Sequence, residues 1–394
     1  MTLPIAPGPR SPLPAEAAPT EAEAAVVGAE RNGTRSGRRP AVLGRRPLRA
    51  GPLSLGWRPR QVLVPLLIAA VLFTAVVMST ARGSSSLSAW EVALRLLGGG
   101  TSDHDFVIFE LRLPRALIGV LVGGALGLAG AIIQGIARNP LASPDILGIT
   151  SGAGVGAVGV IVLGGSYGIL DGPLADIGVP TAAVGGALAA ALAVHLLSVR
   201  RGISGYRVLL VGVGVNAVLG SVLSWLLVRA DIVDVGRALV WLNGSLDQGT
   251  SWSVVRTTSL VLAVLLPVAL VLSFTFGALV YDEDTARGLG VRMTGARVAL
   301  LLIAVLLTAT ATAAAGPVAF VALAAPQLAL RLARTGTPPL LASCLLGAAV
   351  TVWADVLGRT AFGDIQLPVG VVTAALGAPY LLYLLVRSGK ARTS

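Results

Sequence analysis

The chain contains few of the residues that build disulfides, metal sites and nucleotide-binding loops. Its 394 residues include one cysteine, Cys344, which lies inside an apolar run and so excludes a disulfide framework and a cysteine-built metal site. The two histidines, His104 and His195, are far apart in sequence, and we interpret both as structural. Lysine occurs once, at Lys390, and the pattern G-x-x-x-x-G-K-[ST] is absent. The sequence therefore has no phosphate-binding loop of this type, and we expect no bound metal or cofactor.

Charged residues are also scarce. They make up 12% of the chain, whereas 55% of its residues are hydrophobic and the mean hydropathy is +0.83. This composition is far more apolar than a soluble domain with one core requires. A helix needs about 20 apolar residues to cross the hydrocarbon layer, so the chain has room for about ten crossings. We predict an all-α polytopic membrane protein whose main solvent is the lipid bilayer.

The net charge is +11, but its pattern is not typical of nucleic-acid binding. The charges stand at the ends of apolar runs rather than along one polar face, so no nucleic-acid partner is predicted. Residues 1–56 are rich in Pro, Ala, Gly and Arg, which predicts a disordered basic tail ahead of a transmembrane domain at 57–394. A signal peptide is the competing interpretation, and it fits poorly because the first apolar segment begins only near Val62.

Ten apolar segments follow the tail. They occupy 62–80, 114–136, 146–164, 179–198, 207–229, 253–277, 298–315, 318–333, 339–358 and 368–387. The basic tail predicts a cytoplasmic N-terminus, and ten crossings then place the C-terminus in the cytoplasm as well. Most arginines fall in loops that this orientation places inside, and Arg82, Arg95 and Arg237 are among those that fall outside. This is the pattern of a multi-pass protein of the bacterial cytoplasmic (inner) membrane.

Two of these segments carry glycine at four-residue spacing, which lets helix backbones approach closely. The positions are Gly119, Gly123 and Gly127 in the second segment and Gly148, Gly152 and Gly156 in the third. We interpret them as helix-packing positions, although a chain with 49 glycines also yields this spacing by chance. Ala-Gly pairs at 129–130 and 315–316, each followed by a proline-containing stretch, indicate two inverted repeats of helices 2–5 and 7–10.

The most polar stretch between two long apolar segments of the C-terminal half lies at 282–290. It consists of Asp282, Glu283, Asp284, Thr285, Ala286, Arg287, Gly288, Leu289 and Gly290. The acidic residues could cap the start of a short helix and the glycines could end it. Such a helix outside the bilayer would offer a rigid surface to a partner, and an ordinary solvated loop is the alternative.

Several long motifs resemble one family of membrane proteins. They are ELRLPRA at 110–116, GGALGLAGAIIQGIARNPLASPDILG at 123–148, GPVAFVALAAPQ at 316–327, ADVLGR at 354–359 and LPVGVVTAALGAP at 367–379. In this order they look like the signature of FecCD-type permeases, the membrane subunits of importers for iron siderophores, haem and cobalamin. The resemblance covers nearly everything after residue 60.

The resemblance implies a ten-helix subunit that pairs with a second, similar permease subunit around the substrate pathway. Two cytoplasmic ATP-binding subunits would drive transport, and an extracytoplasmic siderophore-binding protein would deliver the substrate. The family's coupling helices lie between spans six and seven, where residues 282–290 fall. The resemblance therefore favours an ATPase-coupling role for this stretch over a solvated loop.

In the family, outward-facing arginines of the permease receive carboxylates of the binding protein. The matching positions are Arg112 and Arg359, which we predict as docking residues. A local alternative stays open for each, because Arg359 could pair with Asp355 one turn earlier and Arg112 with Glu110. Gln327 stands where family members often have histidine, and no role is assigned to it.

The segments 212–216 and 241–246 look more like permeases for ferric siderophores of the enterobactin type than those for cobalamin. We therefore predict a permease subunit of an ATP-binding-cassette importer for a ferric siderophore, without an ATPase site of its own. Haem or cobalamin as cargo is an alternative, and so is an ion-coupled secondary transporter, for which Asp355 is nearly the only candidate coupling residue. A membrane-embedded enzyme would need a catalytic constellation, and the sequence offers none.

Overall fold

The structure is a computed structural model and divides into two units, Met1–Arg58 and Pro59–Ser394. It describes residues 47–50, 53–56, 59–83, 87–100, 103–165, 173–198, 205–273, 293–363 and 365–390. In the first unit, β1 (Pro47–Ala50) pairs in antiparallel register with β2 (Leu53–Gly56), so the end of the tail forms a short hairpin where we expected disorder. The pairing joins Leu48 to Leu55 and satisfies backbone groups locally. The remainder of the predicted tail lies outside the described residues.

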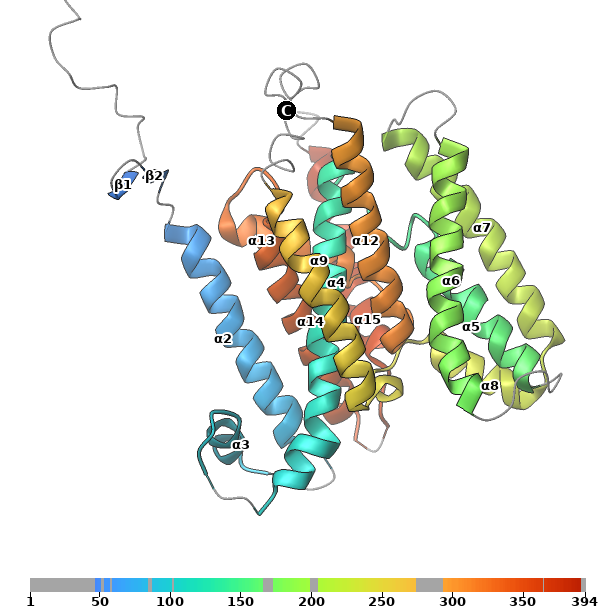
Figure 1. Cartoon of the computed structure of the whole chain (residues 1–394), viewed down its shortest axis with the longest axis horizontal. Coiled ribbons are helices and arrows are strands. Elements are labelled where there is room, and N and C mark those ends of the chain that lie inside the picture. Colours follow the sequence, from blue (N-terminus) through green and yellow to red (C-terminus); the bar gives the residue numbers. More distant parts are fainter. Residues whose placement is uncertain are drawn as a thin grey trace, which may run out of the picture. The chain divides into compact units, whose positions relative to one another are not determined.

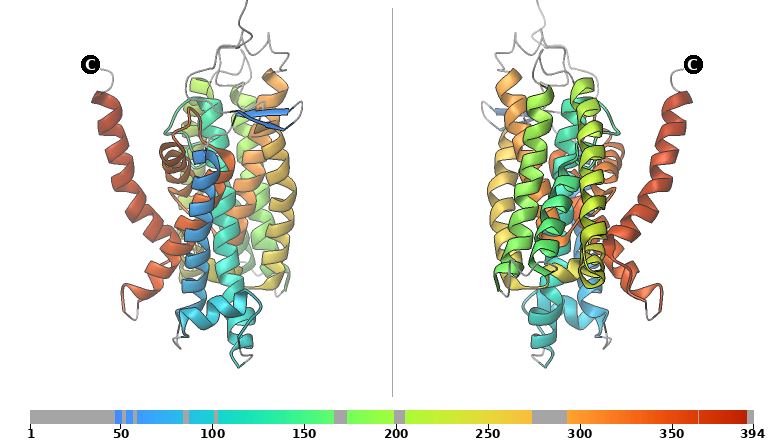
Figure 2. Two further views of the ribbon diagram at one scale, coloured as in Figure 1. Left: turned by 90° about the vertical axis from the view of Figure 1, so that its left-hand side faces the viewer. Right: turned by 90° about the vertical axis from the view of Figure 1, so that its right-hand side faces the viewer.

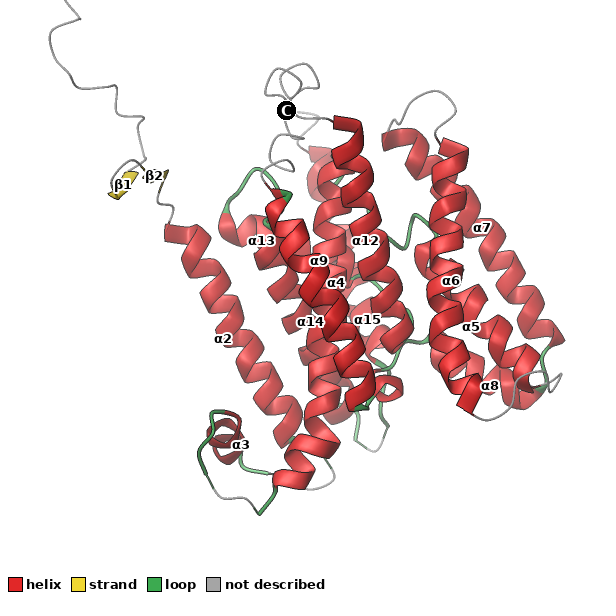
Figure 3. Cartoon of the chain, viewed as in Figure 1, coloured by secondary structure: helices red, strands yellow, loops and turns green. Residues whose placement is uncertain are grey.

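The described part of the second unit consists of helices joined by loops and turns, as Figure 3 shows. Its long helices are α2 (Pro59–Ala81), α4 (Leu113–Ala137), α5 (Ile149–Gly165), α6 (Pro173–Ser198), α7 (Gly205–Arg229), α9 (Trp252–Val271), α12 (Met293–Ala315), α13 (Val321–Ala333), α14 (Leu340–Thr360) and α15 (Val369–Lys390). Each coincides with one predicted apolar segment. Among the described residues, seven stretches are long and apolar enough to cross a membrane, and three shorter apolar helices lie in α5, α13 and α15. The predicted all-α polytopic membrane architecture is thus confirmed.

In the part of the chain that the structure describes, four shorter helices connect the long ones. They are α3 (Ala89–Leu96), the π-helix η2 (Phe106–Arg112), α8 (Ile232–Leu242) and the 3₁₀ helix η4 (Leu246–Gly249). Figure 1 shows α3 and α8 at the same end of the bundle, which we call the α3 end. There α3 buries Val92 against Val77 and Ile108, and this contact holds the loop between α2 and α4 against the helices.

The two shortest of the long helices, α5 and α13, begin a few residues after the start of their predicted segments, and the backbone conformation explains this. Gly148 has φ 75° immediately before α5, and Gly316 (φ 72°) and Phe320 (φ 66°) precede α13. These left-handed residues interrupt the helical path after α4 and after α12. Pro326 does not interrupt α13, which runs through it, and the interruption lies before Val321 instead. The irregular backbone before both helices is packed against protein, as a lipid environment requires.

Among the predicted packing positions, three glycines of α4 and two of α5 lie at close helix crossings. A Cβ on Gly127 would stand 2.2 Å from the Ser343 carbonyl oxygen, and one on Gly123 would stand 2.4 Å from that of Gly347. Gly119 faces the side chains of Leu246 and Val352 at 3.0 Å, which is less tight. On α5, Cβ atoms on Gly152 and Gly156 would stand 2.4 Å from the Gly186 oxygen and 2.1 Å from the Ala182 oxygen of α6. Gly148 differs from the predicted stripe, because it precedes α5 and is set apart by its positive φ.

The helices alternate in direction along the chain. In Figure 1, α4 leaves the α3 end and α12 arrives there, so the first members of the two predicted repeats run oppositely. The second members, α5 and α13, are both short and both follow a left-handed residue. α4 packs on α14, α12 and α13, and α12 also packs on α6. The far half of α15 leans away from the other helices, as Figure 2 shows.

Candidate docking site at the α3 end

The ends of α2, α4 and α14 meet at the α3 end around a hollow rich in arginine. Its lining, which we call the arginine hollow, comprises Ser79, Arg82, Gly83, Leu111, Arg112, Arg115, Arg359, Thr360, Gly363 and Gln366. Both predicted docking arginines therefore line one cavity, although 246 positions (359 − 112 − 1) separate them in sequence. The residues meet because α2 and α14 end where α4 begins.

Arg359 lies in the last turn of α14 and is held from two sides. Its Nε donates to Asp355 Oδ2 at 2.9 Å, one helical turn earlier, so the local ion pair left open by the sequence is present. Its Nη2 donates to Ser79 Oγ of α2 at 2.9 Å. The side chain is 13% exposed and the Asp355 side chain 2%. A partner carboxylate would thus meet an arginine whose orientation is already fixed.

Arg112 stands at the junction of η2 and α4. Its Nη1 donates to the carbonyl oxygens of Thr80 and Ala81, each at 3.1 Å. These are among the last carbonyls of α2, which have no partner within their own helix. A Cβ on Gly83 would lie 2.8 Å from the guanidinium, so glycine is what allows the chain after α2 to pass this close. Arg112 therefore ties the end of α2 to the start of α4.

Arg115 completes the arrangement, and the sequence reasoning assigned it no role. Its Nη2 donates to Asp355 Oδ1 at 2.9 Å, and its Nη1 pairs with Asp247 in η4. The buried Asp355 carboxylate thus bridges Arg115 and Arg359. Arg115 follows Arg112 at three-residue spacing across the junction of η2 and α4, and this spacing was the available signal. In the hollow and its immediate partners, four arginines accompany two aspartates, a balance that favours anionic groups.

Comparison with known proteins identifies the fold and the family. The FecCD transport family matches residues 66–387. The chain belongs to this family. The FecCD chain is 40% identical over 334 residues to the achromobactin transport system permease protein CbrC of Dickeya dadantii (strain 3937), covering 83% of this chain and 91% of CbrC. It is 36% identical over 332 residues to the ferric enterobactin transport system permease protein FepG of Escherichia coli (strain K12), covering 84% of this chain and 98% of FepG.

A solved structure agrees with this relationship. It is described as an inward-facing conformation of a metal-chelate type ABC transporter, and it superposes on the FecCD chain with a TM-score of 0.72 at 26% identity. The superposition covers 83% of this chain and 99% of the other. The predicted family and the predicted multi-pass fold are confirmed by these comparisons.

The second predicted site of the FecCD chain, the coupling stretch at 282–290, lies outside the described residues. It falls between α9 and α12, the sixth and seventh long helices, as the family resemblance requires. Among the described residues no group of three or more His, Cys, Asp or Glu side chains could hold a metal ion.

A buried amide pair links two helices of the FecCD chain, and it gives Gln327 a role that the sequence did not. Gln327 Nε2 donates to Gln134 Oε1 at 2.7 Å. Gln134 Nε2 in turn donates to the Leu323 carbonyl at 3.0 Å and lies 3.5 Å from the Ala322 carbonyl. Pro326 has no N–H, so the Ala322 oxygen lacks its usual helical donor, and the Gln134 amide takes that place. The amide pair thus compensates for the proline within α13.

A carboxyl group with a shifted pKa lies in the connection between α4 and α5. Burial raises the pKa of Asp145 to about 6, and the hydrogen bond from the Thr150 hydroxyl, 3.1 Å from Asp145 Oδ1, opposes the shift. Arg95, in the last turn of α3, and Asp105, just before η2, form an ion pair that lowers the pKa of Asp105. This pair fixes α3 to the start of η2.

Proposed function

We propose that this FecCD chain is the membrane-spanning permease subunit of an ATP-binding-cassette importer that moves a ferric siderophore across the cytoplasmic membrane. The observation that carries the proposal is the family match across residues 66–387, together with relatives named for achromobactin and ferric enterobactin transport. The full sequence contains no phosphate-binding loop, which supports ATP hydrolysis by separate subunits. Both termini would lie in the cytoplasm, and the α3 end would then face outward.

The arginine hollow is our proposed docking site for an extracytoplasmic siderophore-binding protein. Arg112 and Arg359 line one cavity, and the surplus of arginine over aspartate there favours a partner's carboxylates. Guanidinium groups suit this task because they pair with carboxylates through two parallel hydrogen bonds. Their helix-end hydrogen bonds hold them ready before the partner arrives.

Three further partners belong to the proposal. Two cytoplasmic ATP-binding subunits would drive transport, and the stretch 282–290 is the proposed ATPase-coupling segment of this chain. A second, similar permease subunit would complete the pathway, and α7 is a suitable element for that contact, because only 6% of its span is buried within the chain. A helix that is apolar on all sides and so little covered must meet either lipid or another protein.

Uptake measurements test this function. A strain lacking the chain is supplied with radiolabelled iron bound to enterobactin-type, citrate-type or hydroxamate siderophores, or with haem or labelled cobalamin. We expect uptake of a ferric siderophore to return only when the chain, the ATP-binding subunits and the binding protein are all present. Transport by the purified chain alone under a proton gradient would show a secondary transporter instead, and haem or cobalamin uptake would redefine the cargo.

A further inference from the structure

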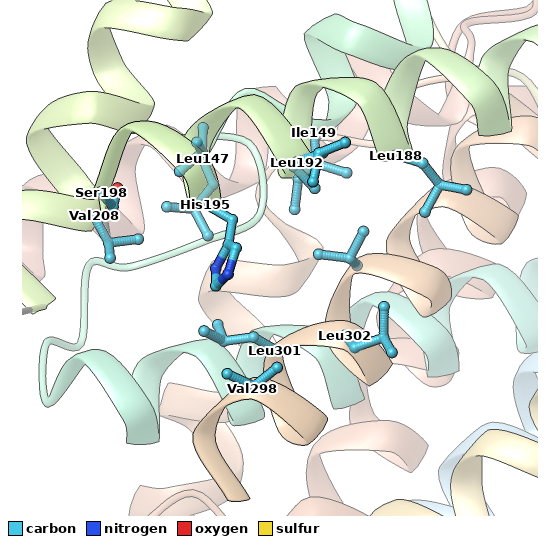
Figure 4. A pocket seen from close by; sticks show the side chains of 13 residues that line it. Leu147, Ile149, Leu188, Leu192, His195, Ser198, Val208, Val298, Leu301 and Leu302 are labelled. Atoms are coloured by element: carbon cyan, nitrogen blue, oxygen red, sulfur yellow. The ribbon is translucent and has the colours of Figure 1, made fainter. Parts of the chain in front are cut away.

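The arginine hollow differs in chemistry from a cavity of about 250 Å³ between α6 and α12. That cavity is lined by apolar side chains together with His195 and Ser198, as Figure 4 shows. Its lining residues Leu192 and Leu302 are exposed and belong to candidate membrane spans, so lipid acyl chains suffice to cover them. The arginine hollow has four arginines among its lining residues, and charged groups that leave water need polar partners. Lipid tails therefore do not complete the hollow, whereas a protein with carboxylates does.

An exposed apolar face of η2 lies at the arginine hollow. Leu111 lines the hollow and is more than half exposed. η2 is a π-helix, in which a residue bonds the one five positions later, so Phe106, which is also exposed, extends the same face. Ile108 points the other way, because it is 4% exposed and packs in one cluster with Val92 of α3. η2 thus buries one side and presents large apolar side chains on the other.

The loop after α14 brings two more exposed apolar side chains to the hollow. Phe362 and Ile365 are each more than half exposed, and the Ile365 N–H donates to the Phe362 carbonyl at 3.4 Å. This bond closes a turn that contains Gly363, whose φ is 64° and which lines the hollow, as Gln366 does. The first and fourth Cα atoms of a turn lie within about 7 Å of each other, so both side chains stand beside the hollow. We call these three exposed side chains the apolar rim: Leu111, Phe362 and Ile365.

We infer that the apolar rim excludes water from the arginine hollow when the extracytoplasmic binding protein docks. The partner surface that fits is a carboxylate surrounded by apolar side chains, because the guanidinium groups receive the charge and the rim receives its surroundings. Contacts that exclude water around a charged pair strengthen it, since charges interact more strongly at low dielectric constant. The inference rests on the proposed docking role of the hollow and adds to it the apolar part of the partner's surface.

The salt dependence of docking tests the rim. The full-length chain, assembled with its partner subunits in lipid nanodiscs, is titrated with the purified binding protein. The triple variant Leu111→Ser/Phe362→Ser/Ile365→Ser should bind about tenfold more weakly than the wild type at about 0.1 M salt. Raising the salt to about 1 M shortens the Debye length from about 10 Å to about 3 Å, and should weaken wild-type binding about threefold but variant binding about thirtyfold. The reason is that without the rim, water and ions reach the arginine–carboxylate pairs.

Two kinds of control accompany the triple variant. Leu111→Met and Ile365→Val keep an apolar side chain at the rim, so each should bind as the wild type does at both salt concentrations. Ile232→Ser changes an apolar side chain that is 88% exposed on α8, at the same end of the bundle but outside the hollow. It should alter neither the affinity nor its salt dependence.

Cysteine labelling is a second measurement, which does not require the triple variant to fold. Phe362→Cys in the assembled importer should react with a membrane-impermeant maleimide, and docked binding protein should slow the reaction several-fold. The native Cys344 is buried, so it should add little background. Ile232→Cys should react equally fast with and without the binding protein. A Phe362→Cys thiol that does not react in the free importer would show that lipid covers the rim, and this would overturn the inference.

The double variant Arg112→Gln/Arg359→Gln separates failure of this inference from failure of the docking proposal. If the double variant loses affinity while the triple variant keeps the wild-type affinity or the wild-type salt dependence, the rim does not exclude water and the inference is overturned. If neither variant loses affinity, the hollow is not the docking site and both proposals are overturned. Loss of affinity in both, with the steeper salt dependence in the triple variant, is the expected result.

Discussion

The α4–α14 and α6–α12 contacts use similar small and apolar residues but differ in how closely the helices pack. At the first, Gly123 and Gly127 bring the backbones so close that a methyl group would overlap a carbonyl oxygen. At the second, leucine and valine side chains hold α6 and α12 apart and leave a cavity of about 250 Å³. Glycine on the contact face closes a crossing, whereas branched side chains on both faces leave space that another molecule can fill.

Polar contacts follow the same division. Around α4, the Arg115–Asp355–Arg359 network and the Gln134–Gln327 pair join α2, α13 and α14 to it. Across the cavity, His195 and Ser198 face leucine and valine. Interhelical hydrogen bonds within a membrane hold helices together, so we expect the α4 side to be the rigid part of the subunit.

The largest effect should come from adding a methyl group at the contact between α4 and α14, where there is no room for it. In Gly127→Ala the new Cβ would lie 2.2 Å from the Ser343 oxygen, so α4 and α14 must separate. We expect the free energy of unfolding to fall by about 3 kcal/mol, or the variant not to accumulate in the membrane. The reason is that a backbone carbonyl cannot move aside as a side chain can. Thermal unfolding in detergent measures the loss. Gly185→Ala on α6, where nothing lies within 4 Å, should be neutral or slightly stabilising, and an equal loss there would contradict the contrast.

The next effect concerns docking. In Arg359→Gln, Asp355 keeps its ion pair with Arg115, so the buried charge remains compensated and the fold should persist. Affinity for the binding protein should fall about tenfold, or about 1.4 kcal/mol, because one fixed guanidinium is lost from the hollow. Surface plasmon resonance at constant ionic strength measures the change. Arg237→Gln, with a side chain 68% exposed at the same end, is the control. Unchanged affinity in the double variant Arg112→Gln/Arg359→Gln would remove the hollow from the docking proposal.

Arg359→Glu is a poorer probe of docking than Arg359→Gln. The new carboxylate would stand beside Asp355, which is 2% exposed, and the repulsion would disturb the end of α14 directly. A loss of docking in that variant could not be separated from a loss of structure. The neutral substitution avoids this because Arg115 remains.

The ten spans could be predicted from the sequence because an apolar run of this length, in a chain with so few charged residues, indicates a membrane-spanning helix. Boundaries at α5 and α13 could not, since they depend on φ values at Gly148, Gly316 and Phe320, and Phe320 is not a residue that signals a turn. The helix that continues through Pro326 could not be predicted, for the same reason. The effect of this proline on α13 depends on a donor from α4, and no local pattern contains that donor.

The candidate site was predicted in part. Arg112 and Arg359 came from family resemblance, and the structure brings them into one hollow. Arg115 was missed because its significance lies in Asp247 and Asp355, which are distant in sequence and reach it only through the fold. The cavity between α6 and α12 had no sequence signal at all, because its lining residues are ordinary for a membrane span.

A smaller effect should come from the amide pair on the α4 side. Gln134→Leu removes the acceptor of the Gln327 amide and the side-chain donor to the Ala322 oxygen. It should lower the free energy of unfolding by about 1 kcal/mol. In a Pro326→Ala background the helix regains an N–H for Ala322, so the same substitution should cost less. A double-mutant cycle by thermal unfolding measures the coupling. Equal costs in the two backgrounds would show that Gln134 does not compensate for the proline.

The smallest expected effect lies in the connection between the two regions. The pKa of Asp145 is raised from 3.8 to about 6, so the folded chain binds this proton more tightly than the unfolded chain. The stabilisation is fully present below about pH 4 and is lost as the pH rises through about 6. Asp145→Asn should remove this dependence, so the variant's melting temperature should gain on that of the wild type between about pH 4 and about pH 7. Asp103→Asn, in an exposed loop, is the control. If the α4 side and helices α5 to α7 unfold together, the relative rise in melting temperature will appear in a single transition. If α5 to α7 unfold first, it will appear only in the earlier of two transitions.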